Sequence, residues 1–264
     1  MGPQARVLVL LALTVVPIVL LAVVPPFAQP LWYHDFADQR CLFCIPHCLN
    51  VVSNLPFLIV GLWGMAYLMR CEPSVRFEQH QDRWYYGFFF FAVALTGIGS
   101  AYYHSDPTNE RLLWDRLPLA MAFMALFAMV IAERISYRAG ITLFMPLVIL
   151  GGGTVVYWHF TEQWGRGDLR PYLLVQLYPL LAIPLILLLF PARFTLTQDL
   201  FAALLCYLFA KGLELADRVV YAQGAIVSGH TLKHLIAALA PYFVLHMLKY
   251  RRLIGRPKEL AVAT

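Results

Sequence analysis

Two short stretches place a serine and three histidines near the ends of apolar segments. "GIGSAYYH" supplies Ser100 and His104, and "GHTLKH" supplies His230 and His234. Each pair is four residues apart and therefore shares one face of a helix. Two imidazoles so arranged can share a metal ion, and a third from another helix completes a three-histidine site. Zinc suits this ligand set best, because a catalytic zinc keeps three protein ligands and an open water position.

Asp115, in "WDRLP", is the carboxylate expected beside this site. It can orient a ligand imidazole or accept a proton from the metal-bound water. The plainer interpretation is that each histidine is an interfacial or hydrogen-bonded residue at a helix end. Ionisable groups within a membrane are costly, however, and by default indicate function. Three histidines and an aspartate at one depth favour the metal site.

The elements that must position these residues are apolar helices. Of the 264 residues, 61% are hydrophobic and 13% are charged, and runs of roughly 18 apolar residues or more can span a bilayer. The sequence predicts an all-α polytopic membrane helix bundle. The net charge of +5 is attributed to membrane orientation, and no nucleic-acid partner is expected. The eight expected spans are about 7–24, 50–69, 84–104, 115–133, 140–158, 172–190, 198–218 and 230–249.

Counting helices between the polar residues places them together. The span ending at 104 delivers Ser100 and His104 to one margin, the span beginning at 115 starts at the same margin, and the last span also starts there. This expectation depends only on the helix count and holds whichever way the protein faces.

Lysine and arginine residues favour cytoplasmic termini, with the metal site near the non-cytoplasmic side. With both ends in the cytoplasm, twelve of these residues fall on that side and six on the other. We expect residues 1–30 to hold an N-terminal transmembrane helix or signal anchor, 31–250 the main membrane domain and 251–264 a basic cytoplasmic tail. A cleaved signal peptide is the alternative for the first run.

Together, "GIGSAYYH", the aspartate of "WDRLP" and "GHTLKH" resemble the alkaline ceramidase family, within the wider group of seven-helix hydrolases that includes adiponectin-receptor-like proteins. The likeness covers roughly residues 35–250 and leaves the first run as an extra N-terminal helix beside a seven-helix hydrolase core. Asp217 also matches a family aspartate.

The resemblance implies a zinc-dependent amidohydrolase that releases a fatty acid and a sphingoid base from ceramide or a similar membrane lipid. It implies that His104, His230 and His234 hold the zinc, with Ser100 and Asp115 catalytic. The alternatives are a receptor-like or lipid-binding member of the same group, and a haem protein, against which the adjacent positions of His230 and His234 argue.

The family's acidic calcium-binding stretch is only partly matched. Asp35 and Asp38 keep carboxylates, whereas Arg40 and His47 replace an asparagine and a glutamate of the family pattern. A cation beside two carboxylates can take the place of calcium, which wants six or more oxygens. Calcium at Asp35 and Asp38 is therefore a lesser expectation.

Other polar features are given structural interpretations. In "CLFCIPHC" we favour a disulfide or unpaired thiols over a second metal site. The loop "HFTEQWGRGDLRPY" is expected to be solvated and to hold internal ion pairs, and the alternative is a site entrance. Lys211 and Lys233 are expected to snorkel.

Overall fold

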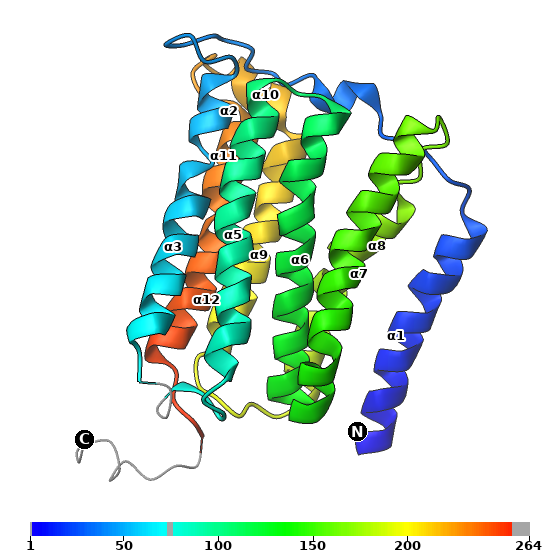
Figure 1. Ribbon diagram of the computed structural model, residues 1–264, viewed down its shortest axis with the longest axis vertical. Coiled ribbons are helices and arrows are strands. Elements are labelled where there is room, and N and C mark those ends of the chain that lie inside the picture. Colours follow the sequence, from blue (N-terminus) through cyan, green and yellow to red (C-terminus); the bar gives the residue numbers. More distant parts are fainter. Residues whose placement is uncertain (1, 73–75, 255–264) are drawn as a thin grey trace.

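The computed structural model describes residues 2–72 and 76–254, and within them the chain is α-helical, with no strand. Figure 1 shows long helices side by side in one bundle. The helices are α1 (Pro3–Val23), η1 (Leu31–His34), α2 (Cys48–Val52), α3 (Leu55–Arg70), α5 (Asp82–Ser105), α6 (Asn109–Arg134), α7 (Tyr137–Gln163), α8 (Arg170–Leu189), α9 (Thr197–Leu215), α10 (Asp217–Ala222), α11 (Gly229–Ala237) and α12 (Leu239–Tyr250).

Within the described residues, seven helical segments are long and apolar enough to cross a membrane. They correspond to seven of the eight expected spans. The remaining expected span, 198–218, contains α9, a 19-residue helix that carries Asp199, Lys211 and Glu214. In the bundle α9 packs against α11 and α12. These three charged residues lie within its 19 residues, and two of them, Lys211 and Glu214, line the cavity described below.

Two expected boundaries differ from the structure. Helix α6 begins at Asn109 rather than near 115, because the Thr108 side chain caps it by accepting a hydrogen bond from the Arg111 amide at 3.3 Å. Asp115 therefore lies inside the helix and not at its start. The turn between α5 and α6 is correspondingly short.

The last expected span is divided into α11 and α12 at Ala238. Pro241 follows three residues later, and proline has no amide hydrogen to donate to the carbonyl of Ala237. The bend at Ala238 is the expected result of that missing bond. It places His230 and His234 on the short segment α11, while α12 continues through the bundle.

Helix α1 lies at the edge of the bundle against α8. The Thr14 hydroxyl and the Tyr178 hydroxyl are 2.6 Å apart, and Arg170 donates to the Leu21 carbonyl at 2.9 Å. Its other faces carry exposed valine and leucine side chains, which suit contact with lipid.

Arg251, the first residue of the expected tail, is fully buried rather than solvated. Its guanidinium donates to Glu133 at 2.7 Å and lies 4.1 Å from the centroid of the Phe194 ring. The ion pair fastens the end of α12 to α6, and the cation–π contact fastens it to the segment between α8 and α9. The remainder of the expected tail, 255–264, lies outside the described residues.

Helices α5 and α6 come closest at Gly99. A Cβ atom at this position would lie 2.0 Å from the carbonyl oxygen of Trp114 and 3.3 Å from the Asp115 nitrogen. Only glycine allows the two backbones to approach so closely. This contact sets the distance between Ser100 and Asp115, which follow the two contacting residues in sequence.

We therefore predict that Gly99→Ala separates α5 from α6 and lowers the free energy of unfolding by about 1–3 kcal/mol or more. Thermal melting in detergent measures the change. Gly87→Ala is the matched control. Gly87 lies on the same helix as Gly99, and a Cβ atom at position 87 would meet nothing within 4 Å. Equal melting temperatures for the two variants would contradict the proposed contact.

Candidate metal centre

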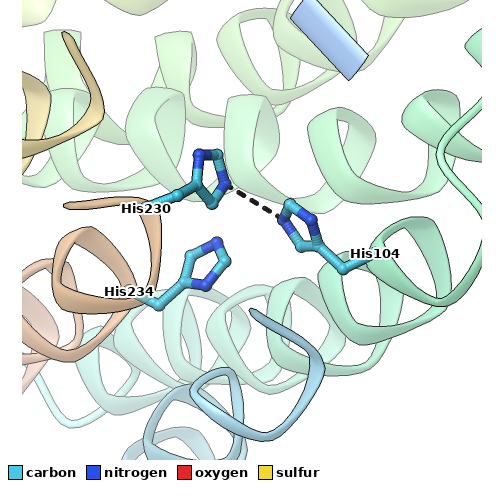
Figure 2. A group of neighbouring side chains, drawn as sticks. All are labelled: His104, His230 and His234. Carbon is cyan, nitrogen blue, oxygen red and sulfur yellow. Dashed lines mark hydrogen bonds between the residues drawn. The ribbon is translucent and has the colours of Figure 1, made fainter. Parts of the chain in front are cut away.

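Three histidines converge where α5 ends and α11 begins, as Figure 2 shows. His104, His230 and His234 are 1%, 3% and 3% exposed. Their ring centroids lie 4.7–4.8 Å apart, and one ligand nitrogen from each lies within 4.8 Å of the others. The predicted convergence is confirmed, although 126 residues separate His104 from His230.

The separation of two ligand nitrogens fits a shared metal ion. Nε2 of His104 and Nε2 of His230 are 3.3 Å apart. Two ligands about 2.0–2.1 Å from a tetrahedral ion are separated by roughly 3.3–3.4 Å, so no rearrangement of this pair is required. Nε2 of His234 is buried with no hydrogen-bond partner among the described residues. A buried imidazole nitrogen without a partner is costly, and a metal ion would satisfy it.

A hydrogen-bond chain from α2 orients His234. Its Nδ1 lies 2.8 Å from the Ser53 hydroxyl, which donates to the Asn50 carbonyl at 3.1 Å. With Nδ1 as the donor to Ser53, Nε2 is the nitrogen left to bind a metal. The Asn50 side chain also accepts from Thr231 on α11 at 2.7 Å, which joins α2 to the helix that carries the histidines.

Asp217 fixes His230 and the loop above it. One carboxylate oxygen accepts from the His230 amide at 2.7 Å, and the other accepts from the Ala37 amide at 2.8 Å. The adjacent Phe36 ring then lies 4.7 Å from the ring of His104 and 4.5 Å from that of His230, measured between centroids. A buried aromatic ring thus covers two of the three imidazoles.

Ser100 and Asp115 lie beside the histidines. Ser100 is buried and lies one turn before His104 on the same helix. Both side chains line the same cavity as His234. The five residues expected to do chemistry are therefore gathered in one place.

That cavity has a polar end and an apolar body. It holds about 1200 Å³ of space, including its open mouth. Its polar end includes Ser100, Asp115 and His234, and its walls come from α3, α5, α6, α8, α9 and the α11–α12 segment, with side chains such as Phe89, Phe123, Leu204 and Val244. An apolar cavity with a few polar groups is typical of a small-molecule binding site.

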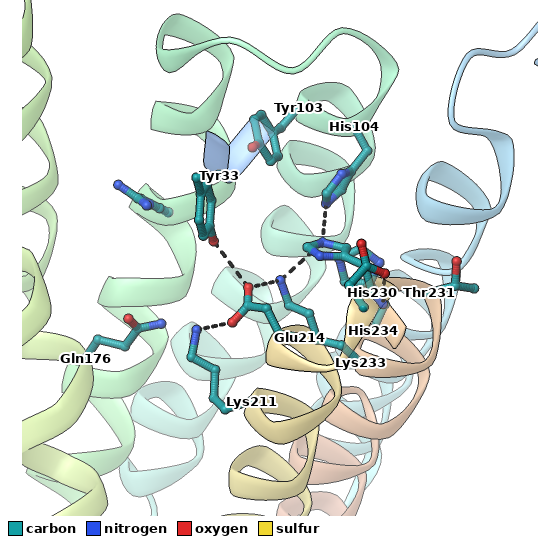
Figure 3. Close-up of polar contacts among 12 residues, drawn as sticks. Tyr33, Tyr103, His104, Gln176, Lys211, Glu214, His230, Thr231, Lys233 and His234 are labelled. Carbon is teal, nitrogen blue, oxygen red and sulfur yellow. Dashed lines mark hydrogen bonds and ion pairs between the residues drawn. The ribbon is translucent and has the colours of Figure 1, made fainter. Parts of the chain in front are cut away.

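Lys211 and Lys233 do not snorkel, contrary to expectation. Figure 3 shows both ammonium groups directed toward Glu214. Lys233 Nζ lies 2.7 Å from Glu214 and 3.3 Å from Nε2 of His230, and Lys211 forms an ion pair with the other carboxylate oxygen. The Tyr33 hydroxyl also donates to Glu214, at 3.2 Å. The lysine between the two histidines of "GHTLKH" could have indicated a role in the site. Its partner, Glu214, lies 19 residues away, so the sequence did not pair them.

The possible calcium residues are paired with arginines instead. Arg40 binds both carboxylate oxygens of Asp38, at 2.8 and 2.7 Å, and this contact lowers the pKa of that carboxyl. Arg218 forms an ion pair with Asp35 at 2.5 Å. With both carboxylates neutralised in this way, the structure gives no support for calcium.

The remaining polar segments have structural roles. Cys41, Cys44 and Cys48 are unpaired thiols, as are Cys71 and Cys206. In the loop after α7, Arg170 pairs with Asp168 at 2.8 Å, which agrees with the expectation of internal ion pairs. That guanidinium lowers the pKa of the Asp168 carboxyl.

Together, the fold and the site define a multi-pass membrane protein with a buried three-histidine metal-binding centre at the end of an apolar cavity. A family model described as Ceramidase matches residues 41–192, more than half of the chain. The chain therefore belongs to the ceramidase family, amidohydrolases that act on ceramide. No curated protein matches it.

The matched segment contains Ser100, His104 and Asp115 but ends before His230 and His234. His230 and His234 lie outside the matched segment, and the folded chain brings them beside His104. The family match and the geometry of the histidines are therefore separate observations that agree.

We predict that Ser53→Ala weakens metal binding by about tenfold to a hundredfold, because His234 loses the hydroxyl that orients it. Competition with a chromogenic chelator measures the affinity. Ser136→Ala is the control: it removes a hydroxyl that caps α7 and should cost stability without changing metal affinity. Equal affinities for wild type and Ser53→Ala would contradict this role.

We also predict that the melting temperature near pH 7 is the same in calcium and in EGTA. Because the pKa of Asp38 is lowered, its pairing with Arg40 should stabilise the fold above the ordinary carboxyl value of 3.8 and be lost as the pH falls below it. Asp38→Asn should lower the melting temperature at pH 7 whether or not calcium is present. A calcium-dependent rise in wild type that Asp38→Asn abolishes would contradict this interpretation.

Proposed function

We propose that this protein is a zinc-dependent membrane amidohydrolase that cleaves the N-acyl amide bond of ceramide or a closely similar lipid, giving a fatty acid and an amine base. The observation that carries the proposal is the convergence of three buried imidazoles at the polar end of an apolar cavity. Family membership supports the reaction class, and the all-imidazole donor set supports zinc.

His104, His230 and His234 would hold the ion in this proposal. Bound zinc would supply a Lewis acid that polarises the amide carbonyl, which is a poor electrophile. The imidazoles' part is to keep the site fixed. Ser53 holds His234, Asp217 holds the backbone of His230, and little reorganisation is needed when substrate enters.

Asp115 is the proposed proton carrier. Its carboxylate takes a proton as the water oxygen bonds to the acyl carbon, and returns that proton to the amine nitrogen as the carbon–nitrogen bond breaks. The products are then a carboxylic acid and an amine, with every atom of the water accounted for. The Ser100 hydroxyl lines the same cavity and would donate to the developing oxyanion.

We propose that the metal site lies near the non-cytoplasmic side, with both termini in the cytoplasm. The start of α1 and the end of α12 lie at one end of the bundle, and the histidines lie near the other. The excess of lysine and arginine in the loops on the side of the termini supports this orientation. The packing of α1 on α8 supports α1 as a retained transmembrane helix beside the domain of 31–250.

The proposal predicts that purified protein contains about one zinc per chain and releases fatty acid from ceramide, and that a chelator abolishes and zinc restores this activity. His104→Ala, His230→Ala and His234→Ala should each lose most of the metal. Ser100→Ala and Asp115→Asn should keep the metal and lose activity by about a hundredfold or more. Elemental analysis and lipid mass spectrometry give the two readouts.

Asp106→Asn is the control for Asp115→Asn. It removes a carboxylate whose side chain is 62% exposed in the turn after α5, and it should leave hydrolysis unchanged. Normal turnover by Ser100→Ala and Asp115→Asn would exclude their proposed roles. Unchanged metal content in all three histidine variants would exclude the proposed centre.

A further inference from the structure

A group of charged side chains at the polar end of the cavity is not used by the proposed reaction. Lys211 and Glu214 come from α9 and Lys233 comes from α11, and all three line the cavity together with Tyr33. Figure 3 shows the two ammonium groups on either side of the Glu214 carboxylate. We call Lys211 and Lys233 the lysine pair.

The lysine pair carries more positive charge than its protein partner neutralises. One carboxylate, Glu214, serves both ammonium groups and also accepts from Tyr33. Asp115 faces the same cavity, but a divalent ion on the histidines would add two further positive charges. With the ion bound, the polar end of the cavity is therefore electropositive.

Hydrogen-bond donors are also left over. An ammonium group has three donors. Among the described residues, Lys211 donates to Glu214, and Lys233 donates to Glu214 and lies 3.3 Å from Nε2 of His230. A metal ion on that nitrogen would occupy its lone pair, and Lys233 would then lose the acceptor. Both lysines would keep donors available to a ligand in the cavity.

We propose that the lysine pair is a subsite that binds an anionic oxygen group, a carboxylate or a phosphate, at the end of a lipid chain. The apolar walls below, with Phe123, Leu126 and Leu204, would hold the chain. Charge-assisted hydrogen bonds from two ammonium groups in such surroundings are stronger than neutral ones.

The identity of the anion rests on the proposed function, which offers two sources. Amide hydrolysis produces a fatty acid, whose carboxylate forms at the same polar end of the cavity. An acidic headgroup on the lipid amide is the other source. The shared chemistry is an anionic oxygen group, and the experiment separates the two sources.

The first measurement uses full-length, zinc-loaded protein and compares binding of palmitate with binding of hexadecanol, its neutral analogue. Wild type should bind the carboxylate about tenfold more tightly or better. Lys211→Met and Lys233→Met should each lose most of that preference, and Lys211→Arg should restore it. Lys249→Met is the matched control, because Lys249 lies over the Trp63 ring and does not line this cavity; it should keep the preference.

Two results would overturn the subsite. One is wild-type protein that does not distinguish palmitate from hexadecanol. The other is an unchanged preference in both Lys211→Met and Lys233→Met, with melting temperatures showing that the variants are folded. Because neither palmitate nor hexadecanol has an amide bond to cleave, a failure here is distinct from a failure to hydrolyse ceramide.

The second measurement uses zinc-loaded protein to identify the source of the anion. If the fatty acid product binds the lysine pair, Lys211→Met should weaken inhibition by palmitate about tenfold. If an acidic headgroup binds there, Lys211→Met should raise the KM for a phosphate-bearing ceramide and leave the KM for neutral ceramide unchanged. If Lys211→Met changes neither the inhibition by palmitate nor the KM for the phosphate-bearing ceramide, the proposed subsite is overturned.

Discussion

Polar side chains inside a bilayer must find their partners within the protein, and this requirement organises the structure around the three histidines. Each imidazole is held by a different part of the chain: His104 by the end of α5, His230 by Asp217 and His234 by Ser53. The short helix α2, the loop at Phe36 and the bend at Ala238 all serve this arrangement.

The sequence was sufficient to predict the features that follow from helix length, the number of helices and the spacing of residues along a helix. The apolar runs predicted a membrane bundle, and the parity of helices between His104 and His230 placed them at the same end. Spacing of four residues placed Ser100 with His104 and His230 with His234. These predictions succeed because hydrophobic length and helical period are local properties that the sequence displays directly.

Other features depend on partners that are distant in sequence. Lys233 was expected to reach an interface, yet a carboxylate on α9 directs it inward beside His230. Helix α6 was expected to start near 115, but the Thr108 cap extends it back to Asn109. Nothing in the sequence paired Ser53 with His234 across 181 residues. Such contacts are set by tertiary packing, for which periodicity carries no signal.

Helices α11 and α12 are the last to be synthesised, and this order determines when the three-histidine site can form. His104 enters the membrane early, and its partners follow only after 126 more residues have been made. Until α11 is in place, the nascent bundle offers one imidazole, which cannot retain an ion as three can. Capture of the metal is consequently among the final events of biogenesis, and a chain interrupted before α11 would lack two of the three ligands.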